Sequence, residues 1–157
     1  MTPVRPLSCA RVLLSLGVTV SVSACGGHTI TKNDVIARGN QICQTAASSV
    51  RAVSPPGGRA ASDLARYYAQ ITPVVETEVK QLRALPRPSQ DRALLDQYLA
   101  AIAGSAAEYQ ALVTAARSGD RASLQSASAA LRSNPAASLA TRYGITECGG
   151  SLGTAAS

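Results

Sequence analysis

The chain has few large aromatic side chains with which to fill a core, and this feature limits its fold most. It contains five tyrosines but no phenylalanine and no tryptophan, although hydrophobic residues make up 46% of its 157 positions. Alanine is the most abundant residue, followed among the apolar types by leucine and valine. Small residues with good helix propensity allow helices to pack closely, whereas strands favour aromatic and β-branched residues. We therefore expect one all-helical domain, because the length leaves no room for two ordinary domains.

Apolar residues recur at helical spacing over most of the chain after residue 30. Short Pro- and Gly-containing segments separate these periodic stretches and predict tight connections between antiparallel neighbours. The sequence therefore predicts an all-α fold, a small antiparallel bundle of about four helices. The expected helices cover residues 31–53, 59–85, 89–117 and 121–133, with a further short helix that ends near residue 143.

Several residues are expected to begin, interrupt or end these helices. Thr31 and Ser89 are candidate N-terminal caps, because their hydroxyls can accept a bond from a free backbone N–H of the first turn. Pro73 lies in the middle of the second helix and is expected to kink it or to split it near Ile71. Gly144 is expected to end the last helix in a left-handed conformation.

The first 25 residues have the pattern of an export signal. Arg5 and Arg11 precede a short apolar stretch, which small residues follow. The segment Val22-Ser23-Ala24-Cys25 resembles the lipobox of bacterial lipoprotein precursors. That resemblance implies that the Cys25 thiol receives a diacylglycerol and that a peptidase cuts before it. An ordinary signal peptide followed by a chance cysteine, or an uncleaved membrane anchor, would be the alternatives.

This interpretation divides the chain into four parts and gives it a location. The mature protein is expected to be lipid-anchored at the extracytoplasmic face of the cell membrane. Its tether would be so short that the domain must lie close to the lipid. The parts are a signal peptide (1–24), the lipidated cysteine with a flexible tether (25–30), the helical domain (31–148) and a disordered tail (149–157).

The four cysteines predict one disulfide. Cys9 would leave with the signal peptide and Cys25 would carry lipid, so that Cys43 and Cys148 remain in an oxidising compartment. Cys43 falls on the apolar face of the first helix, which indicates a buried bond. A metal site is not expected, because two cysteines cannot complete a tetrahedral set and the single histidine, His28, lies in the tether. No cofactor is expected either.

The acidic residues are those that helix surfaces and first turns usually carry, so no catalytic residues are assigned. Asp34 and Asp91 fall in predicted first turns, where negative charge is favourable. Glu78 and Glu108 lack an oppositely charged residue at helical spacing and are expected on exposed faces. Surface pairs at a spacing of four residues are expected between Asp63 and Arg59, Glu76 and Lys80, and Asp96 and Arg92.

The formal charge of +6 is dispersed along the chain, and no basic cluster with aromatic residues indicates nucleic-acid binding. The part of the chain next to the tether is the most basic. Lys32, Arg38 or Arg51 could contact anionic lipid headgroups, although an ordinary solvated helix face would have the same composition. The Tyr67-Tyr68 doublet is expected to place one ring in the core and one at its boundary, where it could contact a ligand.

Three short motifs after the lipobox resemble those of small secreted or lipid-anchored proteins of actinobacteria. They are Asn40-Gln41-Ile42-Cys43, the Leu-x-x-Leu-Pro-x-Pro segment at 82–88, and the Tyr-Gly-x-x-x-Cys segment at 143–148. The resemblance implies a disulfide-clamped helical domain in the cell envelope and brings no catalytic residues with it.

Two functions of different kinds fit these observations. The first is a non-enzymatic envelope protein that binds another protein or a wall component through a helix face. The second is a protein that binds a small apolar or lipid ligand between helices near Pro73, with Tyr67 or Tyr68 at the mouth of the site. An enzyme is not expected, since the sequence offers no usable histidine, metal set or phosphate-binding loop.

Overall fold

The computed structural model describes residues 29–151 and is entirely helical in this part of the chain, which confirms the predicted all-α class. Four helices have 13 residues or more, and two short ones follow them. The signal peptide, Cys25 and His28 lie outside the described residues, as does the tail beyond residue 151. The helices are α1 (Lys32–Arg51), α2 (Ala61–Arg83), α3 (Arg92–Ser118), α4 (Arg121–Ser133), α5 (Ala136–Tyr143) and α6 (Cys148–Ser151).

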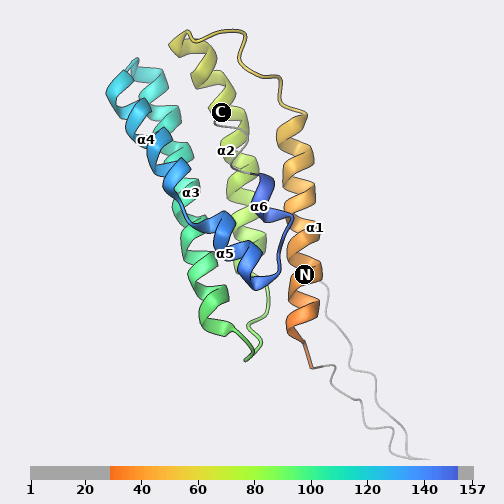
Figure 1. Cartoon of the computed structure of the whole chain (residues 1–157). Helices are drawn as coiled ribbons and strands as arrows, with labels where there is room; N and C mark the ends of the chain where they lie inside the picture. Colours follow the sequence, from red (N-terminus) through yellow and green to blue (C-terminus); the bar gives the residue numbers. More distant parts are fainter. Residues whose placement is uncertain (1–28, 152–157) are drawn as a thin grey trace, which may run out of the picture.

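The long helices lie side by side in chain order and alternate in direction, as an antiparallel bundle requires (Figure 1). α2 packs most extensively on α3, and α3 also supports α4 and α5. α1 packs on α2 at the outside of this arrangement and is held from a second direction by α6. The last two helices therefore return across the bundle from α3 to α1.

The core lies mainly between α2, α3 and the returning α5 segment. Its largest members are Tyr98, Tyr109 and Tyr143, all of which are buried, so three of the five tyrosines fill the space that phenylalanine would otherwise occupy. The aliphatic members occupy one stripe of each helix, as the periodicity predicts. They include Val35, Ile71, Val75, Leu82, Leu95, Leu99, Ile102, Leu112 and Leu139, and Ile145 joins them from the segment between α5 and α6.

α1 begins as the sequence predicts. The Asp34 N–H donates to Thr31 Oγ1 at 3.3 Å, and the Thr31 N–H donates to Asp34 Oδ2 at 2.8 Å, which completes a reciprocal capping box. Two backbone donors that a helix N-terminus leaves unpaired are thereby satisfied.

α2 is one continuous helix, so the split near Ile71, one of the two outcomes expected at Pro73, does not occur. Pro73 removes a single backbone donor. Ile71 and Val75, which lie two residues before and after Pro73, are both fully buried. Thr77 Oγ1 also donates to the Pro73 carbonyl at 2.7 Å. The helix is two residues shorter at each end than predicted.

α3 begins at Arg92, and Ser89 does not cap it. The N-cap residue is Asp91, which has a left-handed backbone with φ 53° and makes no capping bond with its side chain. Its carboxylate instead accepts a hydrogen bond from Lys32 Nζ at 2.6 Å, and that ammonium lies 5.0 Å from the centre of the Tyr143 ring. Asp91 therefore ties the start of α3 to the start of α1.

Residues 149–151, which were expected to begin a disordered tail, belong to α6. Gly144 ends α5 with φ 111°, as predicted, and the next residue, Ile145, is fully buried against α1. A Cβ atom on Gly39 of α1 would lie 2.8 Å from Ile145 Cδ1, so only glycine allows this close approach. Asn40 Oδ1 accepts a bond from the Glu147 N–H at 3.1 Å.

The predicted disulfide is confirmed. Cys43 and Cys148 are bonded, with their Cα atoms 5.1 Å apart, and both residues are buried. The bond joins the middle of α1 to α6 across a sequence separation of 105 residues. A loop of this length corresponds to about 4–5 kcal/mol of stabilisation in the chain-entropy model.

Candidate ligand site between α1 and α2

Glu78 of α2 is an acidic residue that lies in the core. It was expected on an exposed face, but only 1% of its surface is exposed. Residues 71, 75, 78 and 82 recur at helical spacing, and the three apolar members of this series are fully buried. The same spacing identifies Glu78 as a carboxylate on the apolar stripe. Glu108, the other acid expected on an exposed face, is half-buried.

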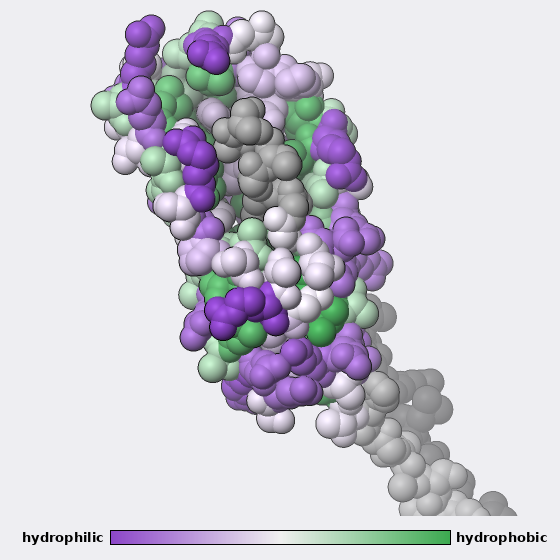
Figure 2. Space-filling model, viewed as in Figure 1, coloured by the Kyte–Doolittle hydropathy of each residue, from purple (hydrophilic) through white to green (hydrophobic). Residues whose placement is uncertain are grey.

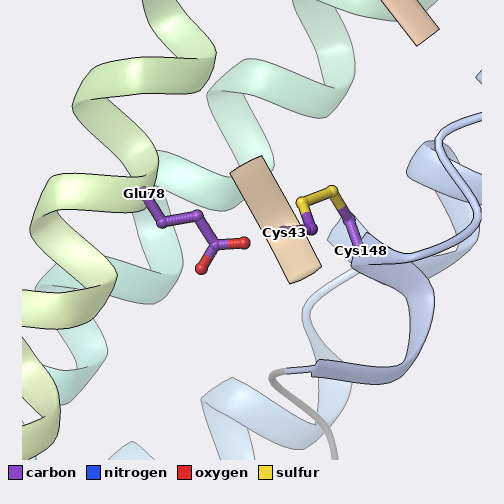
Figure 3. Close-up of side chains that lie close together, drawn as sticks. All are labelled: Cys43, Glu78 and Cys148. Carbon is purple, nitrogen blue, oxygen red and sulfur yellow. A yellow bond between two sulfur atoms is a disulfide. The ribbon is translucent and has the colours of Figure 1, made fainter. Parts of the chain in front are cut away.

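The Glu78 carboxylate points from α2 toward the disulfide that joins α1 to α6 (Figure 3). One of its oxygens and the sulfurs of Cys43 and Cys148 lie within 4.8 Å of one another. Neither carboxylate oxygen has a hydrogen-bond partner among the described residues, and the same is true of the hydroxyls of Tyr98 and Tyr109. A buried polar group without a partner costs free energy, and a buried charge costs more.

Burial raises the pKa of Glu78 from 4.5 to about 7, because desolvation disfavours the ionised carboxylate. Burial also raises the pKa of Tyr109 to about 12, with smaller contributions from Tyr67, Tyr68 and Glu78. The pKa of Tyr98 is raised by burial and then by the Glu78 charge. Near neutral pH the Glu78 carboxyl group is therefore close to the midpoint between its two protonation states.

A cleft of about 260 Å³ opens between α1 and α2 on this side of the bundle, and Glu78 contributes to its lining. The volume is slightly below the range of about 300–1,000 Å³ that is common for small-molecule sites. Pro73 lies on the cleft wall. The lining residues are Ile42, Thr45, Ala46 and Ser49 from α1 and Pro73, Val74, Thr77, Glu78 and Gln81 from α2.

The hydroxyl groups of the cleft all donate hydrogen bonds to backbone carbonyls. Thr45 Oγ1 donates to the Gln41 carbonyl at 2.9 Å, and Ser49 Oγ donates to the Thr45 carbonyl at 3.0 Å. Thr77 Oγ1 donates to the Pro73 carbonyl. Each hydroxyl has one proton, so these three oxygens can only accept further hydrogen bonds.

Cys43, Glu78 and Cys148 form a group of metal-ligand residue types, but their present state does not suit a metal. Thiolate sulfurs are the ligands that zinc and similar ions prefer, and the two sulfurs here are joined in a disulfide. The trio therefore offers one carboxylate and no thiolate.

Tyr67 and Tyr68 lie apart from the cleft. Their ring centres are 5.6 Å apart and both residues are half-buried, so the expected division into one core ring and one boundary ring is wrong. Tyr67 lines a separate hollow beside the Pro55-Pro56 loop together with Arg66, and neither tyrosine lines the cleft at Pro73. Ligand contact at these tyrosines stays a prediction.

The exposed acids have partners other than those that the spacing predicted. Asp63 pairs with Arg66 at 3.0 Å, since Arg59 lies in the loop before α2. Asp96 pairs with Arg87 of the α2–α3 connection at 3.1 Å. Glu76 accepts a bond from Gln110 Nε2 at 2.7 Å. These contacts are on the surface and leave Glu78 as the unusual acid of the described chain.

The cationic residues of α1 that could contact lipid differ in their exposure and in their hydrogen-bond partners. Lys32 is bound to Asp91, whereas Arg38 is exposed. Arg51 is also exposed and donates to Ser48 Oγ at 3.0 Å. Within residues 29–151, no helix combines the length and apolar character needed to cross a bilayer.

The fold and the site define an all-helical domain, clamped by a disulfide, with a small acidic cleft beside the clamp. No known protein family, curated protein or solved structure matches the chain. The functional argument therefore rests on the residues of the cleft.

Proposed function

We propose that this protein is a lipid-anchored, extracytoplasmic protein without enzymatic activity that holds a small, largely apolar ligand in the cleft between α1 and α2. Anchoring is proposed through Cys25, on the resemblance of residues 22–25 to a lipobox. Ligand binding is proposed from the geometry next to the disulfide.

One observation carries the proposal: an acid without a hydrogen-bond partner lies at a cleft lined largely by apolar atoms. Glu78 is 1% exposed, and Ile42, Ala46, Pro73 and Val74 form the apolar part of the lining. A leucine or a methionine at position 78 would avoid the desolvation cost that the carboxylate incurs. Binding sites are where such costs are usually found, because a ligand can supply the missing partner.

The chemistry of the cleft supports binding more than catalysis. Nucleophilic catalysis by a hydroxyl needs a base that accepts its proton. Here the hydroxyls of Thr45, Ser49 and Thr77 donate to backbone carbonyls, so they are not directed at Glu78. The Cys43 and Cys148 sulfurs are in a disulfide and are not free nucleophiles.

Binding of an envelope protein or wall component through a helix face is the alternative proposal. On the face shown in Figure 2, hydrophobic side chains form small groups between hydrophilic ones. Specific protein interfaces usually have a contiguous apolar centre. The cleft therefore has better support than the face in this view.

Native mass spectrometry of the full-length protein, purified in mild detergent from the membranes of the cells that make it, tests ligand binding. We expect a small molecule bound at about one per chain. Thr45→Trp should lower its occupancy severalfold, because Thr45 is exposed and its larger replacement would fill the cleft.

Gln44→Trp is the matched control, since Gln44 is the exposed neighbour that does not line this cleft. Tyr67→Ala should likewise leave the occupancy unchanged. An empty wild-type protein, or equal occupancy in the Thr45→Trp and wild-type proteins, would contradict the proposal. A specific protein partner recovered by crosslinking in intact cells, with an empty cleft, would favour the alternative.

A further inference from the structure

The side chains of the cleft offer mainly hydrogen-bond acceptors. The hydroxyl groups of Thr45, Ser49 and Thr77 donate hydrogen bonds to backbone carbonyls, so their oxygens can only accept further hydrogen bonds. An ionised Glu78 can only accept as well, and both of its oxygens lack a partner. Of the described lining residues, only Gln81 has side-chain N–H donors, and it is exposed.

The only charge that the described lining of the cleft can carry is negative. Among the described residues that line it, Glu78 is the only ionisable one, and none is a lysine or an arginine. The groups that face Glu78 from α3 are the phenols of Tyr98 and Tyr109, which are neutral at physiological pH. The groups that face it from α1 and α6 are the disulfide sulfurs, which do not titrate. Nothing in these neighbours compensates a negative charge on Glu78.

We propose that the ligand is a small amphiphile with a protonated amine. The Glu78 carboxylate, which is buried and points toward the disulfide, turns into the cleft to bind the ammonium group, while the apolar part of the ligand lies along Ile42, Pro73 and Val74. The inference rests on the function proposed above and names the chemical class of the ligand. An ammonium group supplies three N–H donors and one positive charge, whereas the described lining has N–H donors only at the exposed Gln81 and no positive charge. A carboxylate or phosphate ligand would meet a like charge and no donor inside the cleft.

The cleft is small, at about 260 Å³, and it is open to solvent on one side. A short probe with six carbons therefore suits the test.

The test compares three probes of equal chain length: n-hexylamine, 1-hexanol and hexanoate. Each is titrated into the full-length lipidated protein in phosphatidylcholine nanodiscs, with empty nanodiscs as the blank. Binding is followed from the NMR signals of the Ile42 and Val74 methyl groups. We expect hexylamine to bind about tenfold more tightly than hexanol, or better, because its ammonium group adds a positive charge to the hydrogen bond with the carboxylate, whereas the hydroxyl of hexanol is neutral. Hexanoate should bind most weakly.

Variants test the preference for an amine separately from binding to the cleft. Glu78→Gln should remove the preference for the amine and leave the affinity for hexanol within about twofold, because the apolar wall is unchanged. Thr45→Trp should abolish binding of both, whereas the matched Gln44→Trp should abolish neither. The comparison of probes on the wild-type protein does not depend on any variant.

Each failure has a distinct meaning. Equal affinities for hexylamine and hexanol, both sensitive to Thr45→Trp, would overturn the amine inference and support the cleft as an apolar site. Tighter binding of hexanoate would also overturn the inference. Absence of binding by hexylamine and hexanol, with no molecule in the protein as purified, would overturn the proposed function itself.

Discussion

Replacing the buried acid by its neutral isostere, Glu78→Gln, should stabilise the protein above neutral pH and have little effect in acid. The pKa of Glu78 is about 7 in the folded protein and 4.5 in the unfolded chain. The folded state therefore holds a proton more tightly, and the stability from the protonated acid is fully present below pH 4.5. It is lost as the pH rises through about 7.

The size of the effect follows from the difference between the two pKa values. At 1.36 kcal/mol per pH unit, the gap of about 2.5 units corresponds to about 3 kcal/mol of lost stability once Glu78 is ionised in both states. The glutamine variant has no carboxylate to ionise. We therefore expect it to match the wild type within about 1 kcal/mol at pH 4, and to exceed it by about 3 kcal/mol at pH 8.5.

Urea unfolding of both proteins between pH 4 and pH 8.5, followed by circular dichroism, measures this difference. Titration of the remaining acids cancels when the two proteins are compared at each pH. Glu76→Gln is the matched control, because Glu76 lies on the same helix but is exposed, and its profile should run parallel to that of the wild type. Parallel profiles for Glu78→Gln and wild type would refute the burial argument.

Three further changes have specific expected outcomes. Reduction of Cys43–Cys148 should lower the free energy of unfolding by about 4–5 kcal/mol, measured by urea unfolding with and without reductant; two free thiols in native protein would contradict the bond. Gly39→Ala should cost about 1 kcal/mol or more in the same assay, because its Cβ would overlap a buried isoleucine. Gly57→Ala, where a Cβ meets nothing, is its control and should change stability by less than about 0.5 kcal/mol; equal effects would refute the overlap. Cys25→Ser should release the protein from the membrane fraction, and mass spectrometry should find a diacylglyceryl group on Cys25 of the wild type; an unmodified thiol there would contradict the lipobox interpretation.

Local chemistry predicted the features of this fold that depend on neighbours in the sequence. The Thr31 cap, the end of α5 at Gly144 and the helical periodicity each follow from a few adjacent residues. The pairing of Cys43 with Cys148, which are 105 residues apart, was predictable for a different reason, because export would leave these two cysteines and no others.

The remaining features depend on packing between distant segments. Ile145 stands alone in a Gly- and Ser-rich end, and its burial depends on the space that Gly39 leaves more than 100 residues earlier. Aspartate often caps helices with its side chain, but the Asp91 carboxylate binds Lys32 of α1 instead of a backbone N–H of α3. Such contacts have no periodic signature in the sequence.

Glu78 is an intermediate case. Its spacing from Ile71, Val75 and Leu82 places it on the buried stripe, and that signal was present in the sequence. The usual rule that glutamate is exposed outweighed it. The cleft itself could not be predicted, because its shape depends on how α1 packs against α2 beside the disulfide.

The most direct test of the cleft as an amine site is an intermolecular NOE measurement on the full-length protein in nanodiscs with n-hexylamine. The chain is labelled at its methyl groups, and Ile42 and Val74 report on the cleft. Strong NOEs from the probe's methylene protons to these two methyl sets, lost in Thr45→Trp and kept in Gln44→Trp, are the predicted result. NOEs to methyl groups elsewhere on the bundle, or none from a probe that binds, would contradict it.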